Sequence, residues 1–346
     1  MKLATIKSTH KDGTLVITNK EMTHYTPAEH LAATMQHAFD NWDAVAPALL
    51  ELYSQINTGQ VETLPLKQGD LLAPLPRGFQ FLDGSVYLSH VELTRKSRGA
   101  EMPPNLYHDP LMYQGTADHF MAAHDPIEIA NTDWGLDFEA EVVVVTNHVP
   151  QGVTVADAGK HVVALGLIND ISLRALAKEE LLKGFGFIHV KPHNTLSPVF
   201  VTPDELGDAW HENKLHLPMH CTLNGELFGK CEAGEDMYFD YAQLIHHAAK
   251  TRPLHAGTVI GAGTISNHDR SKGSSCIVER RMLETLEHGE AKTAFLKDGD
   301  IIRIEMPDST GTSPFGVIEQ KVVAKKWFYT TITAPPPVTV CAWPCT

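Results

Sequence analysis

The stretch Leu136-Asp137-Phe138-Glu139-Ala140-Glu141-Val142-Val143-Val144-Val145 runs from an acidic alternation directly into four valines. A β-branched run favours a strand, and alternate side chains of a strand share a face, so Glu139 and Glu141 point the same way. Asp137 shares that face. Two carboxylates about 4 Å apart repel by about 4 kcal/mol at a protein-surface dielectric, so a buried cluster requires a proton, a basic partner or a divalent cation. Taken alone, the stretch is more typical of a solvated edge strand, because buried acids are rare.

The composition is that of an ordinary globular protein, with 43% apolar and 20% charged residues over a chain of 346. A chain of this length buries a large core, and we expect two units. The formal charge of −14, without a basic stripe, argues against nucleic acid or a membrane as a partner and leaves cation binding open. The five cysteines are scattered, which predicts neither a disulfide framework nor a zinc ribbon and fits a reducing cytoplasm best. No apolar run is long enough to span a bilayer, and the start is not typical of a signal peptide.

Residues 1–75 are predicted to form a small N-terminal α+β domain. Residues 2–8 and 13–18 are typical of two strands joined as a hairpin. Thr26-Pro27-Ala28-Glu29 is a capping-box sequence with proline at the first helical position, which predicts a helix start. A second helix is expected over residues 42–56. The composition then shifts to Pro, Leu and Gly, which places the domain boundary near residue 75.

Residues 76–326 are predicted to form the main domain, which is strand-rich with short helices interposed. Its expected elements are a short helix over 155–162, a strand over 164–170, a helix over 173–182, a hairpin at Asn224-Gly225, a helix over 239–250 capped by Asp240, and mostly strands over 259–279 and 301–323. Residues 327–346 are rich in Thr, Pro and Cys, which predicts an irregular or disordered tail.

Further acids stand where predicted strands end. Asp83 precedes Gly84, and Asp170 ends an apolar run. Together with Glu139 and Glu141 they would suit one cation. An all-carboxylate set is the ligand field of a hard ion such as Mg²⁺, Mn²⁺ or Ca²⁺, and it disfavours zinc. Lys191 and Arg174 would offset the remaining negative charge.

Several motifs stand in a fixed order along the main domain: Asp83-Gly84-Ser85-Val86-Tyr87-Leu88-Ser89-His90, Tyr113-Gln114-Gly115, Glu139-Ala140-Glu141, Asn169-Asp170-Ile171-Ser172-Leu173-Arg174, Lys191-Pro192-His193-Asn194-Thr195 and Gly263-Thr264-Ile265-Ser266. In this order and spacing, the chain resembles the fumarylacetoacetate hydrolase family over about residues 75–323. It is more similar to the bacterial members that carry a small N-terminal domain.

The resemblance implies a role for each matched residue. The implied metal ligands are Asp83, Glu139, Glu141 and Asp170, with Lys191 and Thr195 beside the metal and Lys191 also taking part in catalysis. The implied substrate contacts are Ser85, Arg98, Tyr113, Arg174, Gly263 and Thr264, of which Arg98 aligns after a one-residue shift. His90 is the implied base. The glutamate that orients it aligns with Glu279 after one gap, and with Ile277 in a gap-free count. Where the animal enzymes place a tyrosine and a glutamine on the substrate, this chain has Ser85 and Ala177, so its pocket is not expected to be shaped for fumarylacetoacetate itself.

The resemblance further implies a mixed β-roll or sandwich core, a cytoplasmic homodimer and Mg²⁺ as cofactor, with Mn²⁺ or Ca²⁺ as alternatives. The implied reaction is hydrolysis of a carbon–carbon bond in a small acylpyruvate or 1,3-dicarbonyl acid. His90 would activate a water molecule and the cation would stabilise the developing enolate. Two alternatives stay open: a decarboxylase or tautomerase of an oxaloacetate-like β-keto acid, and a non-catalytic protein that holds a structural Ca²⁺.

Overall fold

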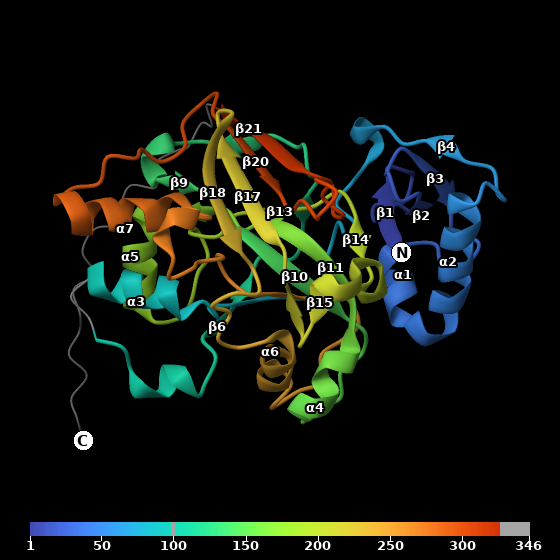
Figure 1. The fold of residues 1–346 in the computed structure, drawn as a ribbon, viewed down its shortest axis with the longest axis horizontal. Helices are drawn as coiled ribbons and strands as arrows, with labels where there is room; N and C mark the ends of the chain where they lie inside the picture. Colours follow the sequence, from blue (N-terminus) through green and yellow to red (C-terminus); the bar gives the residue numbers. More distant parts are fainter. Residues whose placement is uncertain (98–100, 326–346) are drawn as a thin grey trace, which may run out of the picture.

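The computed structural model describes residues 1–97 and 101–325, which form an α+β fold around one large mixed sheet (Figure 1). The sheet has twelve strands, most of them on one path of hydrogen-bonded neighbours. Along that path lie β4 (Leu64–Pro65), β3 (His24–Pro27), β2 (Thr14–Thr18), β1 (Lys2–Ile6), β14 (Phe200–Val201), β11 (Val162–Asn169), β10 (Ala140–Thr146), β19 (Thr258–Gly261), β5 (Phe81–Gly84) and β6 (Met112–Gly115). Off the path, β13 (Asn194–Leu196) pairs with β11 and with β7 (Phe120–Met121).

A second sheet faces the first. Its strands, in spatial order, are β18 (Glu226–Glu232), β17 (Pro218–Leu223), β20 (Ile301–Glu305), β21 (Ile318–Ala324) and β8 (Ile127–Ile129). Two short pairs complete the strands: β9 (Leu136–Asp137) with β12 (Ser172–Leu173), and β15 (Trp210–His211) with β16 (Lys214–Leu215).

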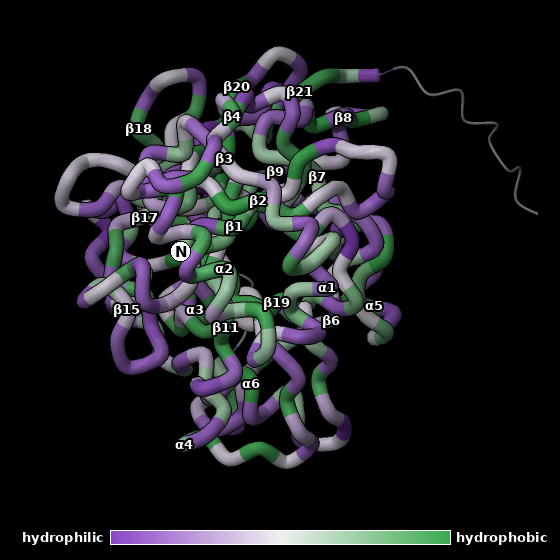
Figure 2. The backbone as a smooth tube through the Cα atoms, turned by 90° about the vertical axis from the view of Figure 1, so that its right-hand side faces the viewer, coloured by the Kyte–Doolittle hydropathy of each residue, from purple (hydrophilic) through white to green (hydrophobic). Residues whose placement is uncertain are grey.

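The helices are short and lie around the sheets. The α-helices are α1 (Met35–Asp40), α2 (Trp42–Asn57), α3 (Leu88–Ser97), α4 (Val155–Ala158), α5 (Arg174–Lys183), α6 (Tyr241–Ala248) and α7 (Ile277–His288). The 3-10 helices are η1 (Gln68–Asp70), η2 (Pro104–Tyr107), η3 (Thr132–Trp134), η4 (Gly159–His161), η5 (Pro203–Ala209) and η6 (Arg270–Lys272). Helices α4 and α6 contact each other at one end of the molecule (Figures 1 and 2). The predicted α+β class, with a mixed sheet core and short helices, is confirmed.

The four consecutive valines lie in strand β10, and the position of this strand in the sheet explains why they are consecutive. It pairs antiparallel with both β11 and β19, so it is a central strand rather than the solvated edge that its acids suggested. Val142 and Val144 belong to the apolar cluster between the two sheets. Val143 and Val145 belong to the cluster on the other face, under α1 and α2. Both faces are dry, which is why the apolar run is continuous rather than alternating.

The N-terminal segment shares the large sheet with the rest of the chain. Strands β1 and β2 form the predicted antiparallel pair, and β1 also pairs with β14, where Leu3 lies opposite Phe200. The helix start predicted at Thr26-Pro27 is wrong, because these residues belong to β3 and Thr26 pairs with Ile17. Helix α1 begins only at Met35, after Thr34, whose hydroxyl accepts a hydrogen bond from the backbone of His37 at 3.2 Å. Strand pairing has overridden a local capping sequence.

The C-terminal half contains one further correction. The hairpin at Asn224-Gly225 is confirmed, with positive φ at both turn residues, and Asp240 caps α6 in a full capping box. The strand prediction over residues 259–279 is wrong beyond Gly261, where β19 ends, and residues 277–288 form helix α7. The tertiary contact that starts this helix involves Asp137 and is described below.

Two predictions fall outside the described residues: the substrate contact at Arg98 and the irregular tail over 327–346. Within residues 1–97 and 101–325, no helix combines the length and the apolarity that crossing a bilayer requires.

Candidate metal and catalytic site

Neighbouring strands of the large sheet bring three acids together. Asp83 on β5 lies opposite Gly261 of β19, and β19 also pairs with β10, which carries Glu141. Asp170 directly follows β11, the other neighbour of β10. All three side chains are buried, and one carboxylate oxygen of each lies within 4.8 Å of those of the other two.

The oxygens of this three-carboxylate group suit a hard cation. Asp83 Oδ1, Glu141 Oε1 and Asp170 Oδ1 are buried and have no hydrogen-bond partner among the described residues, and the same holds for Thr195 Oγ1. A buried acceptor without a partner costs about 1–3 kcal/mol, and more when it is charged. A divalent ion would satisfy these atoms, and an all-oxygen donor set fits Mg²⁺, Mn²⁺ or Ca²⁺.

Two glycines make room for the acids. A Cβ atom at Gly261 would lie 2.6 Å from Asp83 Oδ1 and 2.9 Å from Glu141 Oε2, so a side chain there would occupy their space. Gly263 has a φ of +85°, and its backbone N–H donates to Glu141 Oε2 at 3.1 Å. The backbone itself therefore orients one of the acids.

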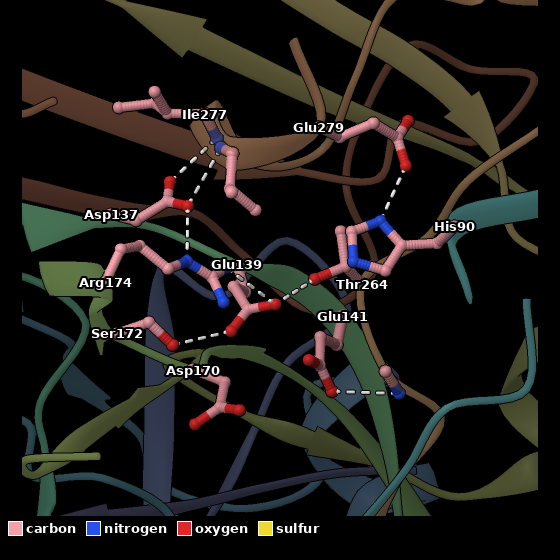
Figure 3. Close-up of polar contacts among 12 residues, drawn as sticks. His90, Asp137, Glu139, Glu141, Asp170, Ser172, Arg174, Thr264, Ile277 and Glu279 are labelled. Carbon is pink, nitrogen blue, oxygen red and sulfur yellow. Dashed lines mark hydrogen bonds and ion pairs between the residues drawn. The ribbon is translucent and has the colours of Figure 1, made fainter. Parts of the chain in front are cut away.

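Glu139 lies beside this group but is held by two cationic side chains, of which Figure 3 shows Arg174. Lys191 Nζ lies 2.6 Å from Glu139 Oε1 and 2.6 Å from Asp170 Oδ2. Arg174 Nη2 lies 3.1 Å from Glu139 Oε2, and the hydroxyls of Ser172 and Thr264 donate to the same carboxylate. The predicted ligand Glu139 thus stands next to the three-carboxylate group with its oxygens already occupied.

The protonation of the group follows from burial and from charge crowding. Burial, reinforced by the Asp170 carboxylate, raises the pKa of Asp83 to about 8. Burial and the neighbouring carboxylates also raise the pKa of Glu141. Burial would raise the pKa of Glu139 as well, but Arg174 and Lys191 hold it well below its usual range. Without a cation, these shifts favour protonation within the three-carboxylate group and ionisation of Glu139.

His90 and Glu279 form a hydrogen-bonded dyad next to these acids. His90 Nδ1 lies 2.7 Å from Glu279 Oε2; the glutamate side chain is 0% exposed and the histidine 18%. The two residues stand in the first turns of α3 and α7, which pack together. In Figure 3, Glu279 approaches the imidazole from the side opposite to Glu141 and Asp170. When Nδ1–H donates to the Glu279 oxygen, Nε2 carries the lone pair that a base needs.

Most of the remaining predicted residues contact the buried acids, whereas Ser85 hydrogen-bonds to the backbone instead. The hydroxyl of Tyr113 donates a hydrogen bond to Asp170 Oδ2 at 2.7 Å, so Tyr113 contacts the three-carboxylate group directly. Arg174 and Thr264 are engaged with acids, as described above. Ser85 is half-buried, and its backbone N–H donates to Leu111. The gap-free alternative Ile277 is buried in the apolar core, which leaves Glu279 as the residue that faces His90.

Two residues that contact the acids of the site, Ser172 and Arg270, were not predicted from the sequence. Ser172 lies inside a quoted motif but received no role, and its hydroxyl donates to Glu139 Oε1 at 2.7 Å. Arg270 belongs to no motif; its Nη1 lies 3.5 Å from Glu279 Oε1 and 3.2 Å from Ser266 Oγ. No local signal marks Arg270, because it meets Glu279 only after η6 and α7 have formed.

A cavity of about 600 Å³ lies behind the segments that carry Asp170 and Lys191. Its lining includes Ile171, Leu173 and Pro192, but none of the three clustered acids. The cavity is therefore a neighbour of the acidic site and not the site itself.

Comparison with known proteins identifies the family. Residues 81–323 match the family described as Fumarylacetoacetate (FAA) hydrolase C-terminal, and residues 1–77 match Fumarylacetoacetase N-terminal domain 2. The chain belongs to the fumarylacetoacetate hydrolase family, as its motifs predicted.

Characterised relatives carry out different reactions. A 2,4-didehydro-3-deoxy-L-rhamnonate hydrolase from Sphingomonas sp. is 26% identical over 64% of this chain and 74% of its own length. An oxaloacetate tautomerase from Bacillus subtilis is 28% identical over 58% of this chain and 64% of its own length. The solved maleylpyruvate hydrolase from Sphingobium sp. SYK-6 shares the fold, with a TM-score of 0.65 at 16% identity over 94% of this chain and 100% of that one. These relatives are enzymes acting on small organic acids, and they differ in whether they hydrolyse or tautomerise.

Proposed function

We propose that this protein is a divalent-metal-dependent hydrolase that cleaves a carbon–carbon bond of a small acylpyruvate or 1,3-dicarbonyl acid. The observation that carries the proposal is the dyad of His90 and Glu279 beside three buried carboxylates whose oxygens lack partners. A base, a residue that orients it and a cation site are the parts that such a hydrolysis needs.

Asp83, Glu141 and Asp170 would hold the cation, which would act as a Lewis acid on negative charge that develops on the substrate oxygen. Lys191 adds a fixed positive charge at the same place, since its ammonium group contacts both Glu139 and Asp170. These contacts hold Lys191 in position.

His90 takes the proton of the attacking water at Nε2, and Glu279 stabilises the imidazolium that results. The water oxygen forms a bond to the carbonyl carbon, and the adjacent carbon–carbon bond breaks. Its electron pair leaves with the second fragment as an enolate, which is then protonated. Two acids result, one of them a 2-oxo acid when the substrate is an acylpyruvate.

A second candidate is a tautomerase or decarboxylase of an oxaloacetate-like β-keto acid. It is favoured by the 28% identity to an oxaloacetate tautomerase and by the fact that proton transfer at the substrate carbon needs the same base and cation but no water attack. His90 would then move a proton between carbon and solvent.

A panel of acylpyruvates and β-keto acids, each assayed with Mg²⁺, with Mn²⁺ and with a chelator, tests both candidates. Two carboxylic products indicate hydrolysis, carbon dioxide indicates decarboxylation, and a change of the enol absorbance without fragmentation indicates tautomerisation. Turnover that persists after chelation and dialysis would contradict the metal requirement. A large rise in melting temperature with metal, but no turnover of any acid in the panel, would favour the structural Ca²⁺ alternative. The homodimer expected from the resemblance is checked separately by light scattering.

A further inference from the structure

Asp137 is a buried acid outside the three-carboxylate group, and its carboxylate joins two parts of the molecule (Figure 3). Its Oδ1 atom accepts a hydrogen bond from the backbone N–H of Ile277 at 2.7 Å, and Oδ2 accepts one from Val278 at 3.0 Å. The same Oδ2 atom accepts a third from Arg174 Nε at 2.9 Å.

The first part is the start of helix α7. The residue before this helix, Cys276, makes no side-chain cap, so Asp137 supplies the cap from a strand 140 residues earlier in the chain. A carboxylate at this position satisfies N–H groups that the helix leaves unpaired and interacts favourably with the helix dipole. Glu279 stands in the same helical turn, and it is the residue that contacts His90. The position of the dyad therefore depends on where Asp137 holds this turn.

The second part is the row of cations along Glu139. Arg174 bridges Asp137 and Glu139, with its Nη2 atom 3.1 Å from Glu139 Oε2. Lys191 contacts the other oxygen of Glu139 and also Asp170, an acid of the three-carboxylate group. Asp137 is thus the common point of a chain of contacts that runs to the cation site on one side and to the base on the other.

We propose that Asp137 is a positioning residue, which sets the placement of His90 relative to the cation site by fixing the first turn of α7 against Arg174. Its effect on turnover rests on the function proposed above. Asp137 acts through Glu279 and Arg174. Both of its oxygens accept hydrogen bonds, whereas an asparagine would offer one acceptor oxygen and would place its NH₂ group against N–H donors on the other side.

The substitution Asp137→Asn separates positioning from simple helix capping, because asparagine is itself a good cap. The matched control is Asp240→Asn, the same change at the cap of α6, where the Asp240 carboxylate accepts a hydrogen bond from the backbone of Gln243 at 2.9 Å. In the metal-loaded enzyme we expect Asp137→Asn to lower kcat roughly 10- to 100-fold with little change in KM, as is usual for residues behind a metal site. Asp240→Asn is expected to keep kcat.

A second readout needs no turnover. The Nδ1–H proton of His90, bonded to a buried carboxylate, gives an imidazole ¹H–¹⁵N signal that is assigned by its loss in His90→Gln. We expect this signal to move in Asp137→Asn and to stay in place in Asp240→Asn. If Asp137→Asn matches the control in both kcat and the His90 signal, Asp137 is only a helix cap and the proposal is wrong. If the wild type turns over no keto acid, the proposed function fails while the His90 signal still tests the coupling.

Val278→Pro provides a second variant should Asp137→Asn not fold. Proline is tolerated in the first turn of a helix and lacks the N–H that Val278 donates to Asp137, so the change removes one contact and leaves the ion pair with Arg174. We expect a lower kcat and a shifted His90 signal. Wild-type values of both would overturn the proposal.

Discussion

The Nδ1 atom of His90 lies 2.7 Å from the Oε2 atom of Glu279, although 189 residues separate the two in the sequence. The glutamate is fully buried, and its other oxygen lies 3.5 Å from Arg270 Nη1. A buried carboxylate that is held between two donors fixes the orientation of the ring that it contacts. This pair gives the histidine a defined tautomer, and it leads to the first prediction.

The dyad predicts which substitutions stop turnover without disturbing the cation site. His90→Ala is expected to lower kcat roughly 10²- to 10⁴-fold, the usual contribution of a general base. Glu279→Gln is expected to lower it as well, because an amide no longer favours the imidazolium. Both variants should still bind Mn²⁺, as measured by titration calorimetry. Full activity in His90→Ala would contradict its assignment as the base.

The three-carboxylate group predicts a metal-dependent rise in stability. At a cation concentration about a hundred times the dissociation constant, binding adds about 2.7 kcal/mol to the free energy of unfolding. Glu141→Gln should remove most of this gain, because it deletes one charged ligand. Glu226→Gln, an exposed acid on β18, is the matched control and should keep the gain. Thermal unfolding with and without Mn²⁺ measures the difference.

The raised pKa of Asp83, about 8, predicts how stability depends on pH. Between its ordinary pKa near 4 and this value, the folded metal-free protein binds more protons than the unfolded chain, so the free energy of unfolding falls as pH rises. A bound cation displaces the proton and removes this loss. The gain in melting temperature caused by Mn²⁺ should therefore grow from about pH 6 to about pH 8. A gain that shrinks over this range would contradict the assignment of Asp83 as a ligand.

Replacing Lys191 should lower the free energy of unfolding, because it would leave buried acids without their cationic partner. Its ammonium group lies 2.6 Å from both Glu139 and Asp170, and all three side chains are buried. Removal of one partner of a buried ion pair typically costs about 3–5 kcal/mol. We expect Lys191→Met to lower the free energy of unfolding by about that amount in urea titrations of the metal-free protein. Lys7→Met is the control, because Lys7 is an exposed lysine directly after β1 that donates to the backbone oxygen of Gly69. Equal losses in both variants would argue against the buried network.

A side chain at Gly261 should disrupt the proposed cation site even though all of its acids are retained. An alanine there would place its Cβ atom 2.6 Å from Asp83 Oδ1, so the carboxylate has to move. We expect Gly261→Ala to abolish the Mn²⁺-induced rise in melting temperature. Gly69→Ala is the control, since a Cβ atom at Gly69 would meet nothing within 4 Å. A normal response to Mn²⁺ in Gly261→Ala would show that these acids do not form the site.

Local sequence patterns were sufficient to predict several elements of the fold. The turn at Asn224-Gly225 needs two residues that accept positive φ, and the Asp240 capping box satisfies its own helix, so neither depends on distant parts of the chain. The same was not true of Thr26-Pro27, where a capping sequence lies inside β3 because these residues pair with β2. Helix α7 was missed because its cap comes from Asp137, which no reading of residues 259–279 could supply.

The sequence by itself determined the family, the fold class and the identity of the acids, because motif order and the continuous valine run of β10 are properties of the chain. Only the tertiary structure decided how those acids are used. It grouped Asp83, Glu141 and Asp170, and it placed Glu139, which directly precedes β10, against Lys191 and Arg174. The physical reason is that a carboxylate becomes a cation ligand or an ion-pair partner according to the charges nearest to it, and those charges come from strands and helices far away in the sequence.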